Sequence, residues 1–392
     1  MLRPAALAAG IVWASCLAAS AQTPNPIVQH YRAYQAALDA NDLAAAEREA
    51  AAALVASEAR DGDGGRTAVL ALNLASVRFL NNNAAGALEP GRRALSLSHS
   101  AGEAQSGVSP ILAQLIVGRA ELATGDASAA ERLSAALEAA QQARLAPEEI
   151  YDAASELGAW AFQHDRFGES RQAWSVAASY AEGSRFGAQF SRASSLTGGA
   201  AAMLMADLQG RRTEELSEGV ARDAWQMLNE AVIALRPLAE MNTDGDVTLA
   251  QRSYAQSLAW RSILRAKLET HRQEVPAYAE AQGDADGFSE VDVPATPTPL
   301  PRCLVRVVPR DNSTLFPSEA LTDRRIGAVA VRFRINEDGR LEDIQSLAVI
   351  GGEDFGESVE RRRSNWRVQR RDDSPSPCRM GMSVITPIAF RQ

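Results

Sequence analysis

GAVAVRFRINEDGRLEDIQ, residues 327–345, is the stretch that decides the fold. Along its first half, apolar residues alternate with small or charged ones. The apolar set is Val329, Val331, Phe333 and Ile335, and the other set is Ala330, Arg332 and Arg334. Asp338-Gly339 then supplies the positive φ that a tight turn requires. The pattern predicts a β-hairpin whose first strand is half-buried, with one face on a core and one in solvent.

The chain before this hairpin has a different character. Residues 27–274 are rich in alanine and have apolar residues at helical spacing, so they predict a series of helices. Residues 275–302 change composition and carry Pro294, Pro297, Pro299 and Pro301, which predict an extended, semi-rigid spacer. The sequence therefore predicts an α+β multidomain protein with helical repeats (27–274), a Pro-rich linker (275–302) and a small α+β domain (303–392).

A weak repeat runs through the helical part. Its clearest copy is Glu156–Gly183, with Leu157-Gly158, Ala161, Ser170, Trp174 and Ala177 at characteristic positions. The small residue that opens the second helix recurs as Ala46, Ala87, Ala130 and Ser170, at steps of 41, 43 and 40 residues. A looser fifth copy spans Asp223–Glu240, with Pro237 expected to end it. This spacing resembles the tetratricopeptide repeat, which implies an α-solenoid with a concave binding surface. A generic array of α-hairpins is the alternative.

Beyond the spacer, a compact unit is predicted. Residues 303–309 form an extended segment, the hairpin follows, and EDFGESVERRRSNWRV (353–368) has the apolar spacing of one amphipathic helix that ends at Trp366. Residues 381–390 form a last strand with Met382, Val384, Ile388 and Phe390 facing inward. Pro387 lacks an N–H group, so this strand is expected to lie at a sheet edge or to bend at the proline.

The whole tail resembles the TonB C-terminal domain. The resemblance depends on Phe316-Pro317 followed by Ala320, on the pattern G-x-V-x-V-x-F-x-I-x-x-D-G from Gly327 to Gly339, and then on Gly352, Trp366 and the terminal strand ending in Phe390. It implies a periplasmic module that pairs through an edge strand with a short segment of an outer-membrane transporter. Main-chain hydrogen bonds would supply the affinity of such strand addition.

Carried over to this chain, the resemblance predicts a partner-binding set at the edge. The set is Phe316, Pro317, Gly381, Met382, Ser383, Val384, Ile385 and Thr386. Ile385 and Ser383 are expected on the solvent face of the strand, and Val384 on the inner face.

The first residues predict export. Arg3, an apolar stretch from Ala5 to Ala19 and the small-x-small triplet Ala19-Ser20-Ala21 are typical of a cleaved signal peptide over residues 1–21. An uncleaved anchor and a lipidated Cys16 are the alternatives. After cleavage, Cys303 and Cys378 are the two remaining cysteines, which favours a disulfide in an exported protein, with two separate buried thiols as the alternative.

Residues for chemistry are scattered. The histidines His30, His99, His164 and His271 fall in different helical units without a second ligand at helical spacing, so no metal site or cofactor is predicted. No catalytic residues are predicted either, and the net charge of −9 argues against nucleic acid as a partner. The sequence favours a non-enzymatic periplasmic protein that binds envelope proteins, such as an outer-membrane receptor or transporter peptide, and meets the membrane only through them. A TonB-type energy transducer with an uncleaved anchor is the alternative, and an unrecognised envelope enzyme is a third hypothesis.

Overall fold

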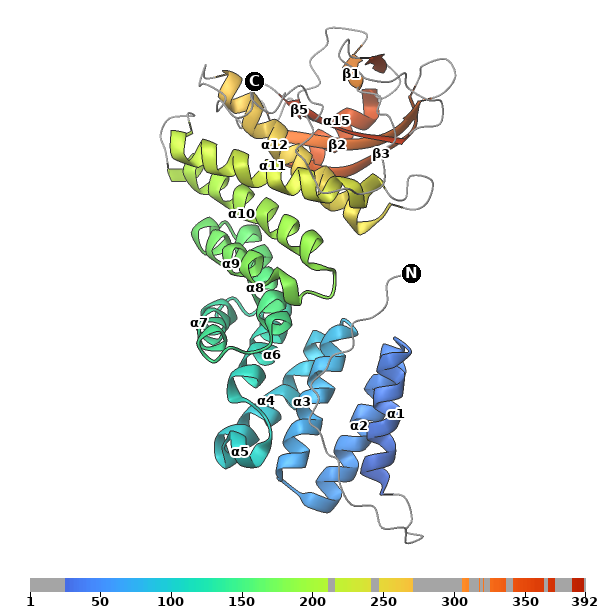
Figure 1. Ribbon diagram of the computed structural model, residues 1–392, viewed down its shortest axis with the longest axis vertical. Coiled ribbons are helices and arrows are strands. Elements are labelled where there is room, and N and C mark those ends of the chain that lie inside the picture. The colour runs from blue at the N-terminus through green and yellow to red at the C-terminus, as the bar shows by residue number, and fades with distance from the viewer. Residues whose placement is uncertain are drawn as a thin grey trace, which may run out of the picture. The chain divides into compact units, whose positions relative to one another are not determined.

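The structure is a computed structural model that describes residues 25–210, 216–240, 247–270, 305–309, 317, 320, 325–335, 341–362, 366–370 and 383–390. It is mostly helical and has a small antiparallel sheet near the C-terminus (Figure 1). The expected fold class is confirmed at this level, as a helical part followed by a small α+β part. The predicted signal peptide, the Pro-rich linker, Cys303 and Cys378 lie outside the described residues.

The helices and strands follow one another in a simple order. The helices are α1 (Pro26–Asp39), α2 (Leu43–Asp61), α3 (Gly65–Leu80), α4 (Ala84–Ala101), α5 (Glu103–Ser106), α6 (Pro110–Ala123), α7 (Ala129–Gln142), α8 (Pro147–Gln163), α9 (Phe167–Ser179), η1 (Ala181–Gly183), α10 (Ala188–Gly210), α11 (Glu218–Glu240), α12 (Leu249–Thr270) and α15 (Glu353–Arg362). The strands are β1 (Val305–Pro309), β2 (Gly327–Ile335), β3 (Leu341–Ile350), β4 (Trp366–Arg370) and β5 (Ser383–Phe390).

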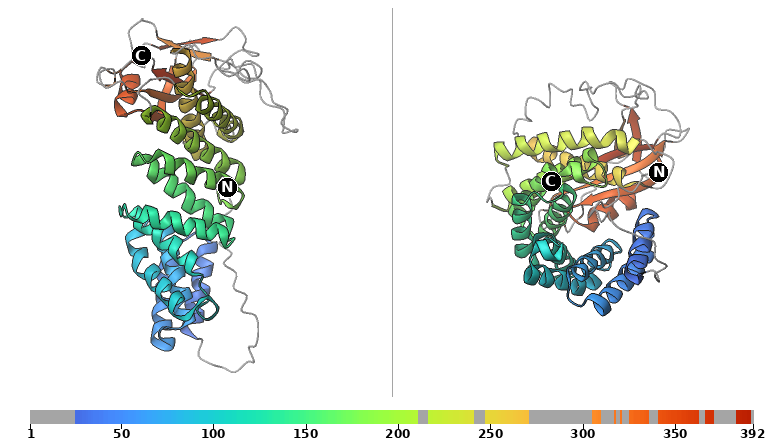
Figure 2. Two further views of the ribbon diagram at one scale, coloured as in Figure 1. Left: turned by 90° about the vertical axis from the view of Figure 1, so that its left-hand side faces the viewer. Right: turned by 60° about the horizontal axis from the view of Figure 1, so that its bottom comes forward.

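The chain forms two compact units. The first contains α1–α8 and η1, and the second contains α9–α12 with all of the described strands and α15. In the first unit α1 packs on α2, α3 on α4 and α6 on α7, so consecutive helices form hairpins (Figures 1 and 2).

The repeat period predicted from small residues recurs in the backbone of the turns. The positive-φ residues Asn41, Asn82, Gly125 and Asp165 each precede one of the four small residues by five positions. Asparagine, aspartate and glycine tolerate this left-handed conformation best, so each turn has a suitable residue. Ala46, Ala87, Ala130 and Ser170 are at most 1% exposed, which lets each second helix pack closely. The steps of 41, 43 and 40 residues therefore describe equivalent turns.

Two details of the helical part were not predicted from the sequence. Helix α11 continues past Pro237 to Glu240, so the proline does not end it. Trp174 lies against α10, where Gly198 leaves room for its ring, because a Cβ at that glycine would overlap it. Trp174 was expected between the two helices of its own repeat.

The sheet has β2 at its centre. The order is β3-β2-β5 with both pairings antiparallel, and β1 pairs with β4 in a separate two-stranded sheet. The predicted β2–β3 hairpin and final strand are therefore confirmed. The turn at Asp338-Gly339 lies outside the described residues.

Helix α15 covers one face of this sheet. Val329, Val331 and Phe333 of β2 pack there with residues of α15, β4 and β5. The rings of Phe355 and Phe390 meet edge to face, with centroids 4.8 Å apart. Gly327 is required beside this contact, since a Cβ there would come within 2.5 Å of the Phe355 ring.

The predicted helix over 353–368 is wrong in its second half. The helix ends at Arg362, and Trp366 begins strand β4, which the sequence analysis missed. The side chain of Trp366 nevertheless lies in the same core as Phe355 and Val359. The spacing identified core residues correctly but assigned the last of them to the wrong element.

Helix α12 covers the opposite face, which was expected to face solvent. It contacts β2, β3 and β5 (Figures 1 and 2). Ala328 and Ala330 have no exposed surface and Arg332 is 7% exposed, so β2 is buried on both faces. The prediction of a half-buried strand is wrong because a helix far upstream in the sequence supplies a second covering layer.

Candidate functional site

Strand β5 lies at one edge of the sheet. It pairs with β2 over its whole length without a register shift, from Arg334–Ser383 to Gly327–Phe390. No described strand pairs with its other side. The candidate residues Ser383–Thr386 thus form the first half of an edge strand, as the sequence predicted.

Pro387 indicates which groups of β5 point to the open side. Opposite residues in an antiparallel pair alternate between those that exchange two hydrogen bonds and those that exchange none. Proline cannot donate, so the Ala330–Pro387 pair belongs to the second kind. Residues of the same parity, Ser383, Ile385 and Ala389, therefore direct their N–H and C=O groups to the free edge. Pro387 itself offers only its C=O there.

The two edges of the sheet differ in how well they accept another strand. Strand β3 has two register irregularities opposite β2, carries Glu342 and Asp343, and has a positive φ at Asp343. Bulges, charges and prolines protect an edge from pairing, and β5 has only the last of these, at Pro387. Strand β5, SVITPIAF, has neither a charge nor a bulge. Of the two edges, β5 is the receptive one.

The side chains of β5 separate to the two faces of the sheet. Ile388 and Phe390 pack in the α15 core, as predicted. Ile385 packs against the apolar cluster of α10, α11 and α12, which includes Leu235, Tyr254 and Leu258. The prediction of Ile385 on a solvent face is therefore wrong, because α12 covers that face. The side chains of Ser383 and Val384 lie outside the described part of the structure.

The remaining candidate positions are described only in part. Pro317 is buried, and Ala320 lies in the α15 core and accepts a hydrogen bond from the backbone N–H of Arg325. Phe316, Gly381 and Met382 lie outside the described residues. A direct role of Phe316 and Pro317 in binding a partner stays a prediction.

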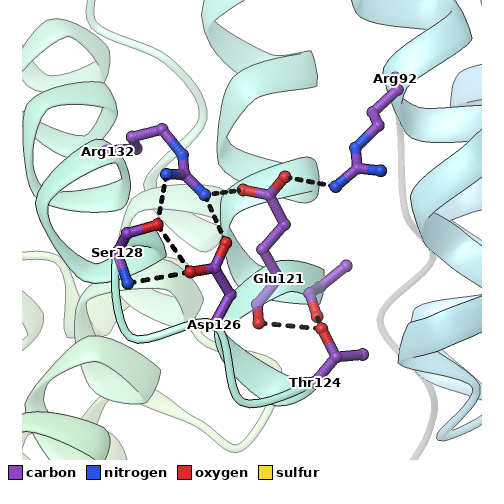
Figure 3. Close-up of polar contacts among 7 residues, drawn as sticks. Arg92, Glu121, Thr124, Asp126, Ser128 and Arg132 are labelled. Carbon is purple, nitrogen blue, oxygen red and sulfur yellow. Dashed lines mark hydrogen bonds and ion pairs between the residues drawn. The ribbon is translucent and has the colours of Figure 1, made fainter.

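The first unit contains a polar network between α4, α6 and α7 (Figure 3). Glu121 lies 2.8 Å from an Arg92 nitrogen and 2.6 Å from an Arg132 nitrogen, and Arg132 also contacts Asp126. Burial opposes ionisation of Glu121, but the hydrogen bonds from Arg92 and Arg132 outweigh it and hold its pKa below the ordinary value. Each member has a partner within the network, so it joins helices and does not present a reactive group.

A second cluster joins α6 to α8. The Arg119 side chain is 8% exposed and faces three carboxylates, those of Glu149, Asp152 and Glu156. Desolvation lowers the pKa of Arg119, but the carboxylates outweigh it and raise that pKa. Burial raises the pKa of Glu149 despite the neighbouring guanidinium. This cluster is an interhelical ion-pair network.

The described residues contain no group of three His, Cys, Asp or Glu side chains arranged to hold a metal ion. His30 contacts Glu49, and the ring of His164 stacks on Trp160. Among the described helices, none combines the length and apolar character needed to cross a membrane.

Comparison of the sequence with protein-family models and with curated proteins finds no match. The geometry of β5 and the residue patterns of the sequence are therefore the features that point to a function.

Proposed function

We propose that this is a non-enzymatic interaction protein of the cell envelope. Tetratricopeptide-like repeats form its scaffold, and a TonB-like C-terminal module binds an extended segment of a partner by strand addition at β5. The observation that carries the proposal is the contrast between the regular, uncharged edge of β5 and the bulged, acidic edge of β3. Export to the periplasm is part of the proposal, supported by the signal-peptide pattern of residues 1–21.

The open side of β5 also limits the size of the bound segment. Ser383 and Ile385 offer donors and acceptors at every second residue, and the missing donor at Pro387 interrupts that row. A short extended segment beside the first half of β5 fits this pattern. Its source would be an envelope protein such as an outer-membrane receptor or transporter.

The proposed mechanism is tested by removing one backbone donor. Ile385→Pro removes an N–H that points to the free edge, whereas Ile385→Ala removes the same side chain and keeps the N–H. The exported full chain carrying each change would be used to enrich envelope proteins, with quantification by mass spectrometry. We expect the alanine variant to retain the outer-membrane proteins enriched by the wild-type chain and the proline variant to lose them.

Folding of the proline variant is the necessary control. Hydrogen exchange of β2 should match that of the Ile385→Ala variant, because both changes remove the same side chain and the inward-facing groups of β5 still pair with β2. Thr386→Pro removes an inward donor and should disrupt the pairing itself. If a folded Ile385→Pro chain enriches the same proteins as the alanine variant, strand addition at β5 is not the mechanism.

Determination of the mature N-terminus separates the two envelope hypotheses. We expect it at Gln22, after removal of residues 1–21. A chain that keeps its first residues in the inner-membrane fraction would instead favour the energy transducer.

A further inference from the structure

The first unit contains two charged networks that share helix α6 but differ in their balance of charge. The network around Glu121 joins two arginines to two carboxylates (Figure 3). The network around Arg119 joins a single guanidinium to three carboxylates of α8. We call the first the balanced network. The second has an excess of negative charge.

Arg119 makes its hydrogen bonds with only two of the three carboxylates. Its Nε and one terminal nitrogen donate to Glu156 at 2.9 and 2.8 Å, and the same terminal nitrogen donates to Asp152 at 3.3 Å. The guanidinium also lies 4.8 Å from the centre of the Phe79 ring in α3. Glu149 differs, since its carboxylate lies 3.7 Å from the other terminal nitrogen and accepts no hydrogen bond from it.

The negative charges of α8 also lie close to one another. Glu149 and Asp152 are three residues apart, and Asp152 and Glu156 are four apart, so all three share one face of the helix. Like charges at these spacings destabilise a helix. Glu148 adds a fourth carboxylate four residues before Asp152, and Arg185, beyond η1, is a cation that acts on it.

The start of α8 is covered by neighbouring elements. Helix η1 packs on α8, and Gly183 lies so close that a Cβ there would come within 2.5 Å of the backbone nitrogen of Glu148. The Glu149 side chain is 21% exposed. Burial is the largest influence on the pKa of Glu149 and raises it, attraction to Arg119 opposes this, and repulsion by the acidic neighbours adds to it. Burial likewise raises the pKa of Glu148.

Helix α7 packs on α8 as well and carries the charged residues Glu131, Arg132 and Glu138. All three are exposed, and Arg132 belongs to the balanced network. The main influences on the Glu149 carboxyl therefore come from α6 and from α8 itself.

A carboxyl group with a raised pKa reverses the usual dependence of stability on pH. Its favourable contribution is fully present below its ordinary pKa, near 4, and is lost as the pH rises through the raised value. Ionised Glu149 therefore weakens the α6–α8 contact at neutral pH, and protonation removes that cost. Asp152 and Glu156 still hold Arg119 when Glu149 is neutral, because they accept its hydrogen bonds.

We propose that the contact between α6 and α8 is a pH-responsive joint, in which Glu149 carries an excess negative charge at neutral pH and its protonation in mild acid tightens the packing of the two helices. We call this contact the α6–α8 joint. It lies entirely within the first unit. The proposal does not depend on which molecule binds β5.

The test uses a neutral variant of the full chain and hydrogen exchange. Glu149→Gln imitates the protonated carboxyl group and keeps the shape of the side chain. Peptides from α6 and α8 are followed by mass spectrometry, with rates corrected for the intrinsic effect of pH on exchange. We expect Glu149→Gln to slow their exchange about threefold at pH 7, the size of effect that a partly exposed charge produces. At pH 5, wild-type α6 and α8 should approach the rates of the variant.

Glu121→Gln is the matched control on the balanced network. Glu121 accepts hydrogen bonds from Arg92 and Arg132, so its neutralisation removes a stabilising charge. We expect this variant to exchange faster in α6 at pH 7, opposite in sign to Glu149→Gln. Exchange of α1 and α2 should stay unchanged in Glu149→Gln chains and reports that the fold is intact. If it accelerates there, Glu148→Gln takes the place of that variant and is judged by the same criterion.

Two results would overturn the proposal. Unchanged or faster exchange of α6 and α8 in the folded neutral variant at pH 7 would mean that the ionised carboxylate does not weaken the contact. An equal response to pH in wild-type and variant chains would mean that another group responds to acid.

Discussion

The two helices that cover the sheet, α15 and α12, contact different kinds of side chain on β2. Towards α15, β2 contributes large apolar side chains to a core shared with Trp366 and Phe390. Towards α12, it contributes two alanines and an arginine bonded to Gln251. Both helices belong to the same compact unit as the sheet. The alternation of large apolar residues with small or charged ones in β2 therefore corresponds to two helices that cover its two faces.

The two ends of β5 also pack on different sides of the sheet. Because Ile388 and Phe390 lie in the α15 core, the end of β5 is fixed to the sheet. Ile385, nearer its beginning, packs against the helices. The backbone N–H groups of Ser383 and Ile385 point outward. The half of β5 that carries them is thus the half that packs against the helices through Ile385.

The largest expected effect comes from the α15 side. Trp366→Ala removes a large, buried aromatic from the core, and such changes cost about 3–5 kcal/mol. We expect hydrogen exchange of β2 and β5 to accelerate accordingly, or the sheet to unfold. The helices α1–α8 should keep their protection, because they form a separate compact unit.

Ile385→Ala is the matched change on the α12 side. The Ile385 side chain is only partly buried. Its loss should therefore lower the free energy of unfolding of the sheet by about 1 kcal/mol, much less than Trp366→Ala. If the two substitutions accelerated exchange of β2 to the same degree, the larger contribution expected from the α15 core would be contradicted.

A further prediction concerns a disulfide bond in the C-terminal module. A Cys303–Cys378 disulfide would enclose β1, β2, β3, α15 and β4, which supply most residues of the α15 core. For a loop of this length, the entropy of the unfolded chain predicts a stabilisation of up to about 4 kcal/mol. Peptide mapping without reduction should find the cross-link in exported protein, and reduction should lower the denaturation midpoint of the sheet. Two free thiols in that material would contradict the prediction.

Residue patterns predicted the local structure well. The period of two in β2, the Pro387 position at an edge and the spacing of small residues in the repeats correspond to features that neighbouring residues determine. The repeat steps reappear even in the positive-φ residues of the turns, such as Asn41 and Asn82.

Long-range contacts were not predictable in the same way. Nothing around Arg332 indicates that Gln251, 81 residues earlier, will cover it. An arginine between alanines is equally typical of a strand face in water, so the covering helix could not be inferred from periodicity. Strand β4 was missed for a related reason, because its partner β1 is distant in sequence and Trp366 also fits the apolar spacing of the helix before it.

The smallest expected effect is a pH dependence of the stability of the sheet, and it arises on the α15 side. On the α15 side, Arg325 forms a two-point contact with Asp354, at 2.6 and 3.0 Å, and donates to the carbonyl of Gly351. Hydrogen bonding from Arg325 lowers the pKa of Asp354, against a smaller opposing effect of burial. On the α12 side, Arg332 donates a hydrogen bond to the side-chain amide of Gln251.

A carboxylate with a lowered pKa stabilises the fold above its ordinary pKa, near 4, and this contribution disappears as the pH falls through the lowered value. We therefore expect the free energy of unfolding of the sheet to decrease between pH 5 and pH 3 by at most about 1 kcal/mol from this pair, because both side chains are partly exposed. Asp354→Asn should remove that part of the pH dependence. Glu357→Gln, on the same helix but more exposed and 3.8 Å from Arg361, should leave it nearly unchanged. Denaturant titrations at each pH provide the measurement. Equal pH profiles for wild-type and Asp354→Asn chains would show that the Arg325 contact does not contribute to holding α15 on the sheet.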